Sequence, residues 1–119
     1  MKTSSDNIFI GTMSGTSHDG IDICSLNVAN HISLLKFSSF KYPTQLREDI
    51  SRAIQRQELS LNMYFDLDKR IGQAFSKSIK KFLTQNKINK KNVAAIGLSG
   101  QTLFHNPKGK YPFSIQAGD

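Results

Sequence analysis

The chain has 119 residues, of which 38% are hydrophobic and 21% charged, a composition that fits one small globular domain and excludes a wholly disordered chain. Sixteen Lys and Arg against nine Asp and Glu leave a net charge of +7, which attracts nucleotides, nucleic acid or an anionic membrane surface. A single cysteine excludes an intrachain disulfide. The polar start of the chain and the short apolar run after it do not make a signal peptide or a membrane span, so we expect a cytoplasmic protein.

The first third of the chain predicts three strands joined by short connections. Its apolar runs are separated by residues that favour turns, and they are rich in β-branched and aromatic side chains. The apolar residues of 21–28 recur at every second position except at Ile23 and Cys24, which are adjacent. This break in the alternation indicates either a bulge or a strand covered on both faces. The predicted strands are residues 8–10, 21–28 and 32–40, with a loop at 12–20 and a turn at 29–31. Strands connected in this way form an antiparallel meander.

Two helices are predicted after Pro43. Thr44 can cap the first, and Ser60 the longer second one, whose apolar stripe must pack on the sheet. The apolar positions are Leu46, Ile50, Ala53 and Ile54 in the first helix, and Leu61, Tyr64, Phe65, Ile71, Phe75, Ile79, Phe82 and Leu83 in the second. Basic residues gather on and after the second helix, where they form either a solvated face or a binding surface. They are Lys77, Lys80, Lys81, Lys87, Lys90 and Lys91.

The last third begins with a compact apolar run. Val93–Leu98 follows a basic connection, which is typical of a buried parallel strand after a crossover helix. Residues 101–119 contain two prolines and two glycines, so we expect a loop there with one short strand at Phe113–Gln116. The order of elements predicts an α/β fold, with a mixed layer and a right-handed crossover.

Gly11–Asp22, between the first two predicted strands, is the segment that best fits a chemical role. Glycines let backbone N–H groups converge on an anion, and Ser and Thr hydroxyls add donors, so such a loop can hold phosphate oxygens. It lacks the Gly-Lys-Ser/Thr ending of a Walker loop, so charge compensation falls to a magnesium ion that Asp19 or Asp22 could hold, directly or through water. The alternative is a hairpin loop whose polar side chains only satisfy nearby backbone groups, although hairpin loops are usually shorter.

Met13–Asp22 reads Met-Ser-Gly-Thr-Ser-His-Asp-Gly-Ile-Asp. This segment resembles the Met-Ser-Gly-Thr-Ser-x-Asp-Gly-x-Asp signature of the anhydro-N-acetylmuramic acid kinases. Two later segments agree in order and spacing, namely Ile96–Thr102 with His105 and Pro107, and Ser114–Asp119. The resemblance covers nearly the whole chain, which is similar to the N-terminal portion of that family.

The resemblance implies the ribonuclease-H-like half of the ATPase fold of hexokinase, actin and the Hsp70 chaperones, with residues 1–119 as the phosphate-binding subdomain and the C-terminal domain absent. It implies a kinase that uses MgATP to hydrolyse the 1,6-anhydro bond of anhydro-N-acetylmuramic acid and phosphorylate O6, giving N-acetylmuramic acid 6-phosphate in peptidoglycan turnover. The implied ATP-phosphate segment is Gly15, Thr16, Ser17, His18, Asp19, Gly20, Ile21 and Asp22. The general-base aspartate of the family is expected beyond Asp119, so we expect the chain alone to be inactive.

Three polar residues near the end of the chain are candidates for the sugar side of the site. Gln101 and Thr102 follow a predicted strand, where ligands collect in α/β sheets, and we expect them to contact the substrate or to support the site. His105 is either a sugar contact or a loop histidine with one backbone partner. Leu98 and Ser99 stand where the family usually has a Ser-His pair, so a role for that imidazole does not carry over.

Two other interpretations compete with the kinase. One is a non-catalytic module whose basic helix face binds nucleic acid through its phosphates, but it lacks interleaved aromatic residues and any nucleic-acid motif. The other is one product of a split or frameshifted kinase gene, which assembles with a separately encoded C-terminal part. The signature favours the kinase, with ATP, Mg²⁺ and 1,6-anhydro-N-acetylmuramic acid as its ligands.

Overall fold

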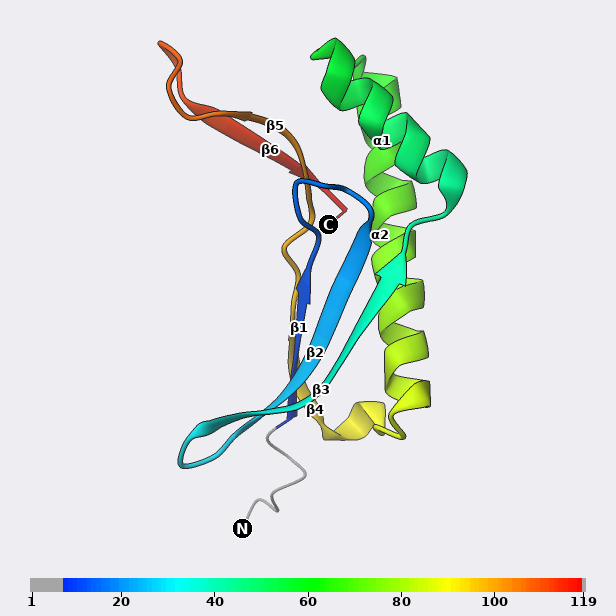
Figure 1. Cartoon of the computed structure of the whole chain (residues 1–119), viewed down its shortest axis with the longest axis vertical. Helices are drawn as coiled ribbons and strands as arrows, with labels where there is room; N and C mark the ends of the chain where they lie inside the picture. The colour runs from blue at the N-terminus through cyan, green and yellow to red at the C-terminus, as the bar shows by residue number, and fades with distance from the viewer. Residues whose placement is uncertain (1–7, 119) are drawn as a thin grey trace.

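The computed structural model describes residues 8–118 and contains one mixed sheet, two helices and a separate hairpin (Figure 1). The sequence-based expectations for residues 1–7, and for Asp119 in the last motif, lie outside the described residues. The sheet consists of β1 (Ile8–Met13), β2 (Gly20–Val28), β3 (Ile32–Lys41) and β4 (Val93–Gly97). Its order is β3-β2-β1-β4, with β1, β2 and β3 antiparallel and β4 parallel to β1. The predicted meander, crossover and parallel return are therefore confirmed.

The strands differ from their predicted form in two places. β1 continues to Met13, so the loop that follows it is shorter than expected. No bulge occurs at Ile23 and Cys24; β2 alternates regularly there, and the register against β3 shifts between Ser25 and Leu26. Two apolar residues are adjacent in the sequence here because Ile23 faces the helices, while Cys24 lies on the opposite face of the same strand.

The sheet face turned away from the helices, here called the open face, is also apolar. Strand alternation and register place on it Phe9, Met13, Cys24, Leu26, Val28, Ile32, Leu34 and Phe37. Leu34 is 63% exposed and Phe37 60% exposed, because no described element covers them. Sheets with one solvated face normally carry polar residues there, so this pattern is that of a sheet covered on both sides.

β4 was predicted to be buried, and this prediction is wrong for the described residues. The strand is parallel to β1 as expected, but four of its five residues are exposed. β4 lies at the edge of the sheet, where only β1 adjoins it. Ile96, for example, remains 45% exposed.

α1 (Thr44–Arg56) packs through Leu46, Ile50 and Ala53, as its sequence pattern predicts. The predicted cap is wrong, since Thr44 is already the first helical residue and Pro43 occupies the cap position without a side-chain hydrogen bond. A proline is well suited to this place because no backbone N–H donor is needed there, and its ring already holds φ near the value for a helix entry.

α2 (Leu61–Gln85) begins where predicted, with the Ser60 hydroxyl accepting from the Met63 amide at 3.2 Å. The helix buries Leu67, Ile71, Phe75, Ile79 and Phe82 against β-strand residues such as Ile10, Ile21 and Ile23. Leu61 and Phe65 were predicted to belong to this stripe, but they are 74% and 61% exposed. They lie in the first turns of the helix, and Leu67 is the first of its residues to be buried.

The chain ends in an antiparallel hairpin, β5 (Gln101–Asn106) and β6 (Phe113–Ala117), after the short 3-10 turn η2 (Lys90–Asn92) and β4. β6 was predicted, but β5 was expected to be loop. Pro107 and Gly109 mark the hairpin turn rather than an unstructured tail. The hairpin projects beyond the end of the sheet at which the β1–β2 loop and the start of α1 also lie (Figure 1).

Candidate functional site

The β1–β2 loop, residues 14–19, lies at one end of the sheet between the β5–β6 hairpin and the helices (Figure 1). A tight turn shapes it, because the His18 amide donates to the Gly15 carbonyl at 3.1 Å. The far end of the loop is attached to the residue after β3, since the Tyr42 amide donates to the Asp19 carbonyl at 3.1 Å. The loop is therefore held at both ends by regular structure.

A buried polar cluster of Ser14, Tyr42 and Gln101, here called the loop anchor, supports the loop from the protein interior. The three residues are 7%, 5% and 0% exposed. Ser14 Oγ lies 2.5 Å from Gln101 Oε1 and 2.9 Å from the Gly20 carbonyl, and the Tyr42 hydroxyl lies 3.0 Å from Ser14 Oγ. Each hydroxyl has one hydrogen. The shortest contacts are satisfied when Tyr42 donates to Ser14 and Ser14 donates to Gln101.

The amide nitrogen of Gln101 completes the loop anchor. Nε2 donates to the Gly15 carbonyl at 3.3 Å and to the Thr102 carbonyl at 3.1 Å. One side chain thus joins the start of β5 to the loop. Burial raises the pKa of Tyr42 above its ordinary value, with an opposing effect from the hydrogen bond to Ser14. The phenol is therefore a donor at neutral pH.

Several donors of the loop have no partner among the described residues. They include the backbone N–H groups of Thr16, Ser17 and Asp19 and the side-chain hydroxyls of Thr16 and Ser17. Gly15 also faces open space, because the nearest atom to a Cβ placed there would be Ser17 Oγ at 4.0 Å. Unpartnered N–H groups beside a residue without a side chain are features of loops that bind anions.

Gly20 has a different role from Gly15. A Cβ on Gly20 would lie 2.1 Å from the Phe40 carbonyl oxygen, so β2 and β3 could not keep their register with any side chain there. The side chain of Ile21 is 1% exposed and belongs to the core. Of these two predicted phosphate-segment residues, one is required for strand packing and the other offers a ligand only its backbone.

The two predicted carboxylates differ in surroundings. Asp22 lies on the open face, where its Oδ1 accepts from Ser39 Oγ at 2.5 Å. Asp19 is exposed, with no side-chain partner among the described residues. Within residues 8–118 no group of three or more His, Cys, Asp or Glu could hold a metal ion. A magnesium ion here would need phosphate oxygens and water to complete its shell, which is how Mg²⁺ commonly binds beside nucleotides.

The predicted sugar-side residues meet the loop around one hollow of about 550 Å³, a size suited to a small ligand. Its lining is Thr16, Ile54, Gln57, Thr102, Leu103, Phe104, His105, Asn106 and Phe113. Thr102 and His105 border it directly, whereas Gln101 is buried beneath the loop. Of the two alternatives for Gln101, contact or support, its burial fits support.

Sequence reasoning missed two members of the loop anchor. Ser14 stood inside the signature but was not singled out, and Tyr42 carried no signal because its partners are 28 and 59 residues away. Ser99 also attaches the loop. Its Oγ accepts from the Ser14 amide at 3.2 Å, while Leu98 is 50% exposed.

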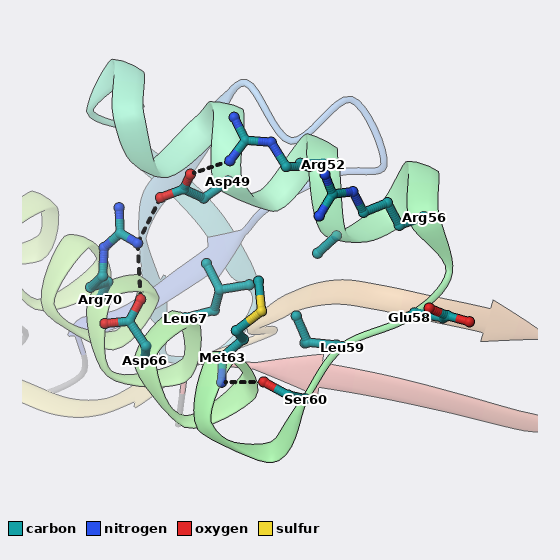
Figure 2. A pocket seen from close by; sticks show the side chains of 11 residues that line it. Asp49, Arg52, Arg56, Glu58, Leu59, Ser60, Met63, Asp66, Leu67 and Arg70 are labelled. Atoms are coloured by element: carbon teal, nitrogen blue, oxygen red, sulfur yellow. Dashed lines mark hydrogen bonds and ion pairs between the residues drawn. The ribbon is translucent and has the colours of Figure 1, made fainter.

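A second hollow, of about 330 Å³, lies between α1 and α2 and includes no residue of the loop. Figure 2 shows Arg70 of α2 between Asp49 of α1 and Asp66. Its Nη1 lies 2.8 Å from Asp49 Oδ2 and 3.0 Å from Asp66 Oδ2. Three arginines and three carboxylates line this hollow, so their charges balance. It therefore lacks the positive charge that a phosphate site would need, and its ion pairs join the two helices instead.

Comparison with known proteins identifies the family. The family model for anhydro-N-acetylmuramic acid kinase matches residues 7–119. Proteins named anhydro-N-acetylmuramic acid kinase from Actinobacillus pleuropneumoniae serotype 7, the gamma-proteobacterium EBAC31A08 and Vibrio vulnificus are 39%, 42% and 34% identical to the chain. The alignments cover 95%, 97% and 98% of this chain and 31%, 32% and 32% of those proteins, so the chain spans about a third of the length of the curated relatives it matches. The chain belongs to the anhydro-N-acetylmuramic acid kinase family.

Proposed function

We propose that this chain is the phosphate-binding subdomain of an ATP-dependent sugar kinase with the ribonuclease-H-like half of the actin, hexokinase and Hsp70 ATPase fold. In this proposal residues 15–22 hold the phosphates of MgATP. The parent reaction is cleavage of the 1,6-anhydro bond of anhydro-N-acetylmuramic acid by water, with transfer of the γ-phosphoryl group to O6. The reaction belongs to cytoplasmic recycling of peptidoglycan sugars.

The observation that carries the proposal is the hollow at which Thr16 meets Thr102 and His105. A kinase must bring a phosphate donor and a hydroxyl acceptor to adjacent positions, because positioning supplies much of its catalysis. The two sides of this hollow come from segments that are more than 80 residues apart in sequence. Both segments carry motifs that resemble the family's.

The donors of the loop support its assignment to phosphate. The unpartnered N–H groups of Thr16, Ser17 and Asp19 and the open space at Gly15 match what a phosphate group requires. The loop anchor keeps these groups in place before a ligand arrives. Such preorganisation reduces the entropy lost on binding.

The carboxylates of the loop fit a magnesium ion bound together with ATP. Asp19 is exposed and unpartnered among the described side chains, and Asp22 retains one oxygen that no described residue contacts. Either would hold the ion directly or through water. When bound, the ion would neutralise charge on the phosphates.

The chain's contribution to the sugar side is limited to Thr102, His105 and the support given by Gln101. The general base that activates water is expected in the two-thirds of the relatives that lie outside the match. That part is either a continuation of the same polypeptide or a separately encoded chain. We therefore expect residues 1–119 to bind MgATP weakly and to show no turnover.

The test compares two glycines of the same loop, Gly15 and Gly20. Gly15→Ala adds a methyl group to open space, so we expect an unchanged unfolding midpoint and at least a fivefold loss of affinity for MgATP, measured with a fluorescent ATP analogue. Gly20→Ala forces a methyl group against the Phe40 carbonyl and should lower the unfolding midpoint.

A parallel titration with a short single-stranded DNA tests the nucleic-acid alternative. Salt-sensitive DNA binding together with no response to MgATP would refute the kinase assignment. Equal MgATP affinity in the wild type and in Gly15→Ala would refute the assignment of this loop.

A further inference from the structure

The side chain of His18 connects the β1–β2 loop to α1. Its Nε2 lies 2.7 Å from Ser51 Oγ, and its Nδ1 lies 2.9 Å from the carbonyl oxygen of Thr16. His18 adopts a left-handed backbone conformation with φ 44°, which is uncommon for a residue other than glycine. The ring thus bridges its own turn and a helix that begins 26 residues later in the sequence.

The two contacts fix the direction of both hydrogen bonds. A carbonyl oxygen can only accept, so Nδ1 carries the hydrogen and donates to Thr16. In the neutral ring Nε2 is then an acceptor, and the Ser51 hydroxyl donates to it. Both nitrogens of the imidazole are therefore satisfied by this chain.

This arrangement orients the peptide group between Thr16 and Ser17. The described chain has no cis peptide, and in a trans peptide the C=O and N–H groups point in opposite directions. Because His18 holds the Thr16 carbonyl, the Ser17 N–H is directed away from the imidazole. That N–H is one of the loop donors with no partner among the described residues.

We propose that His18 and Ser51 form a brace that presents the Ser17 N–H to the nucleotide phosphate. His18 is in this view a positioning residue, and it acts through the Thr16–Ser17 peptide rather than by touching the phosphate. The family signature leaves the position of His18 open, so the brace is a property of this chain and not of the motif. The inference rests on the proposed function for its ligand, but the brace itself can be tested without nucleotide.

The experiment uses Ser51→Ala, with Ser51→Thr to restore a hydroxyl and Ser76→Ala as a control for the same change on an exposed position of α2. Amide hydrogen exchange of His18, whose N–H donates to the Gly15 carbonyl within the same turn, is measured without nucleotide, and MgATP affinity is measured by titration. Alanine favours a helix more than serine does, so Ser51→Ala should keep its unfolding midpoint.

Ser51→Ala is expected to speed exchange of the His18 amide and to weaken MgATP binding by roughly three- to tenfold, as loss of one hydrogen bond would. Ser51→Thr should return both values to within about twofold of the wild type, and Ser76→Ala should change neither. Unchanged exchange and unchanged affinity in Ser51→Ala would overturn the brace. A wild-type chain that binds no MgATP would overturn the proposed function and the role of the brace in phosphate binding. Faster exchange in Ser51→Ala would even then establish that the contact between His18 and Ser51 holds the loop.

Discussion

Replacing Gln101 with Glu tests the loop anchor without changing the shape of the side chain. Gln101 is fully buried, and its Nε2 faces the carbonyl oxygens of Gly15 and Thr102. A glutamate would place an oxygen there, and an ionised one would be an unpaired charge in the core. We therefore expect the folded protein to keep this carboxyl group neutral, with its pKa raised far above the ordinary value of about 4.3.

The size of the effect follows from the pH. A group kept neutral in the folded state destabilises it by about 1.4 kcal/mol for each pH unit above the unfolded pKa, which gives about 3.7 kcal/mol at pH 7. Near pH 3, about one unit below the unfolded pKa, the group is almost fully neutral in both states, and only the lost N–H donor remains, a cost of about 1 kcal/mol. The free energy of unfolding of the variant should therefore approach that of the wild type steadily as the pH falls from 7 to 4.

The assay is urea denaturation of Gln101→Glu and wild type at several pH values. Gln116→Glu makes the same chemical change at an exposed position of the neighbouring strand β6, and it should cost less than about 0.5 kcal/mol at every pH. A deficit for Gln101→Glu that is no larger than that of the control at pH 7, or one that does not depend on pH, would refute the buried role of Gln101.

Three further changes test other parts of the structure. Asp49→Asn removes the carboxylate that pairs with Arg70, and the hydrogen bond from Arg70 lowers the pKa of Asp49 below 3.8. In acid denaturation curves, loss of this pair should therefore cost the wild type up to about 0.5 kcal/mol of stability as the pH falls below that value, a contribution that the variant lacks. Tyr42→Phe should cost about 1 kcal/mol at pH 7 in urea denaturation. Because burial raises the pKa of Tyr42 above 10.0, the wild type should also lose stability as the pH rises past 10, and the variant should lose less. Ser60→Ala removes the cap of α2 and should lower stability by about 1 kcal/mol, whereas Thr44→Ala, which removes no cap, should not.

Local signals predicted much of the fold. The meander follows from apolar runs with short connections, and the start of α2 follows from Ser60 before an apolar stripe. The prediction of α2 failed in its first turns, at Leu61 and Phe65, because burial there depends on where the sheet ends. β5 escaped prediction because its sequence, Gln-Thr-Leu-Phe-His-Asn, has few strong strand formers and is stabilised by pairing with β6.

The candidate site was only partly predictable, for a related reason. The loop was found because its donors are contiguous in sequence, and Thr102 and His105 were found through their motif. The side-chain contacts that attach the loop to the rest of the protein are long-range: Ser14 with Gln101, and His18 with Ser51. No local pattern specifies such pairs, since each forms only after the sheet, α1 and β5 have been brought together.

The open face has a consequence for how the protein behaves in solution. Phe37, Leu34 and Ile32 are each at least 60% exposed on a strand that is also an edge of the sheet. Copies of the chain can associate through such a surface, either face to face or by pairing of their edge strands. These 119 residues alone should therefore form oligomers as their concentration rises. Sedimentation velocity over a dilution series would record this as a sedimentation coefficient that falls on dilution. A polypeptide that covers the open face would abolish the dependence and would make the sheet part of a larger core.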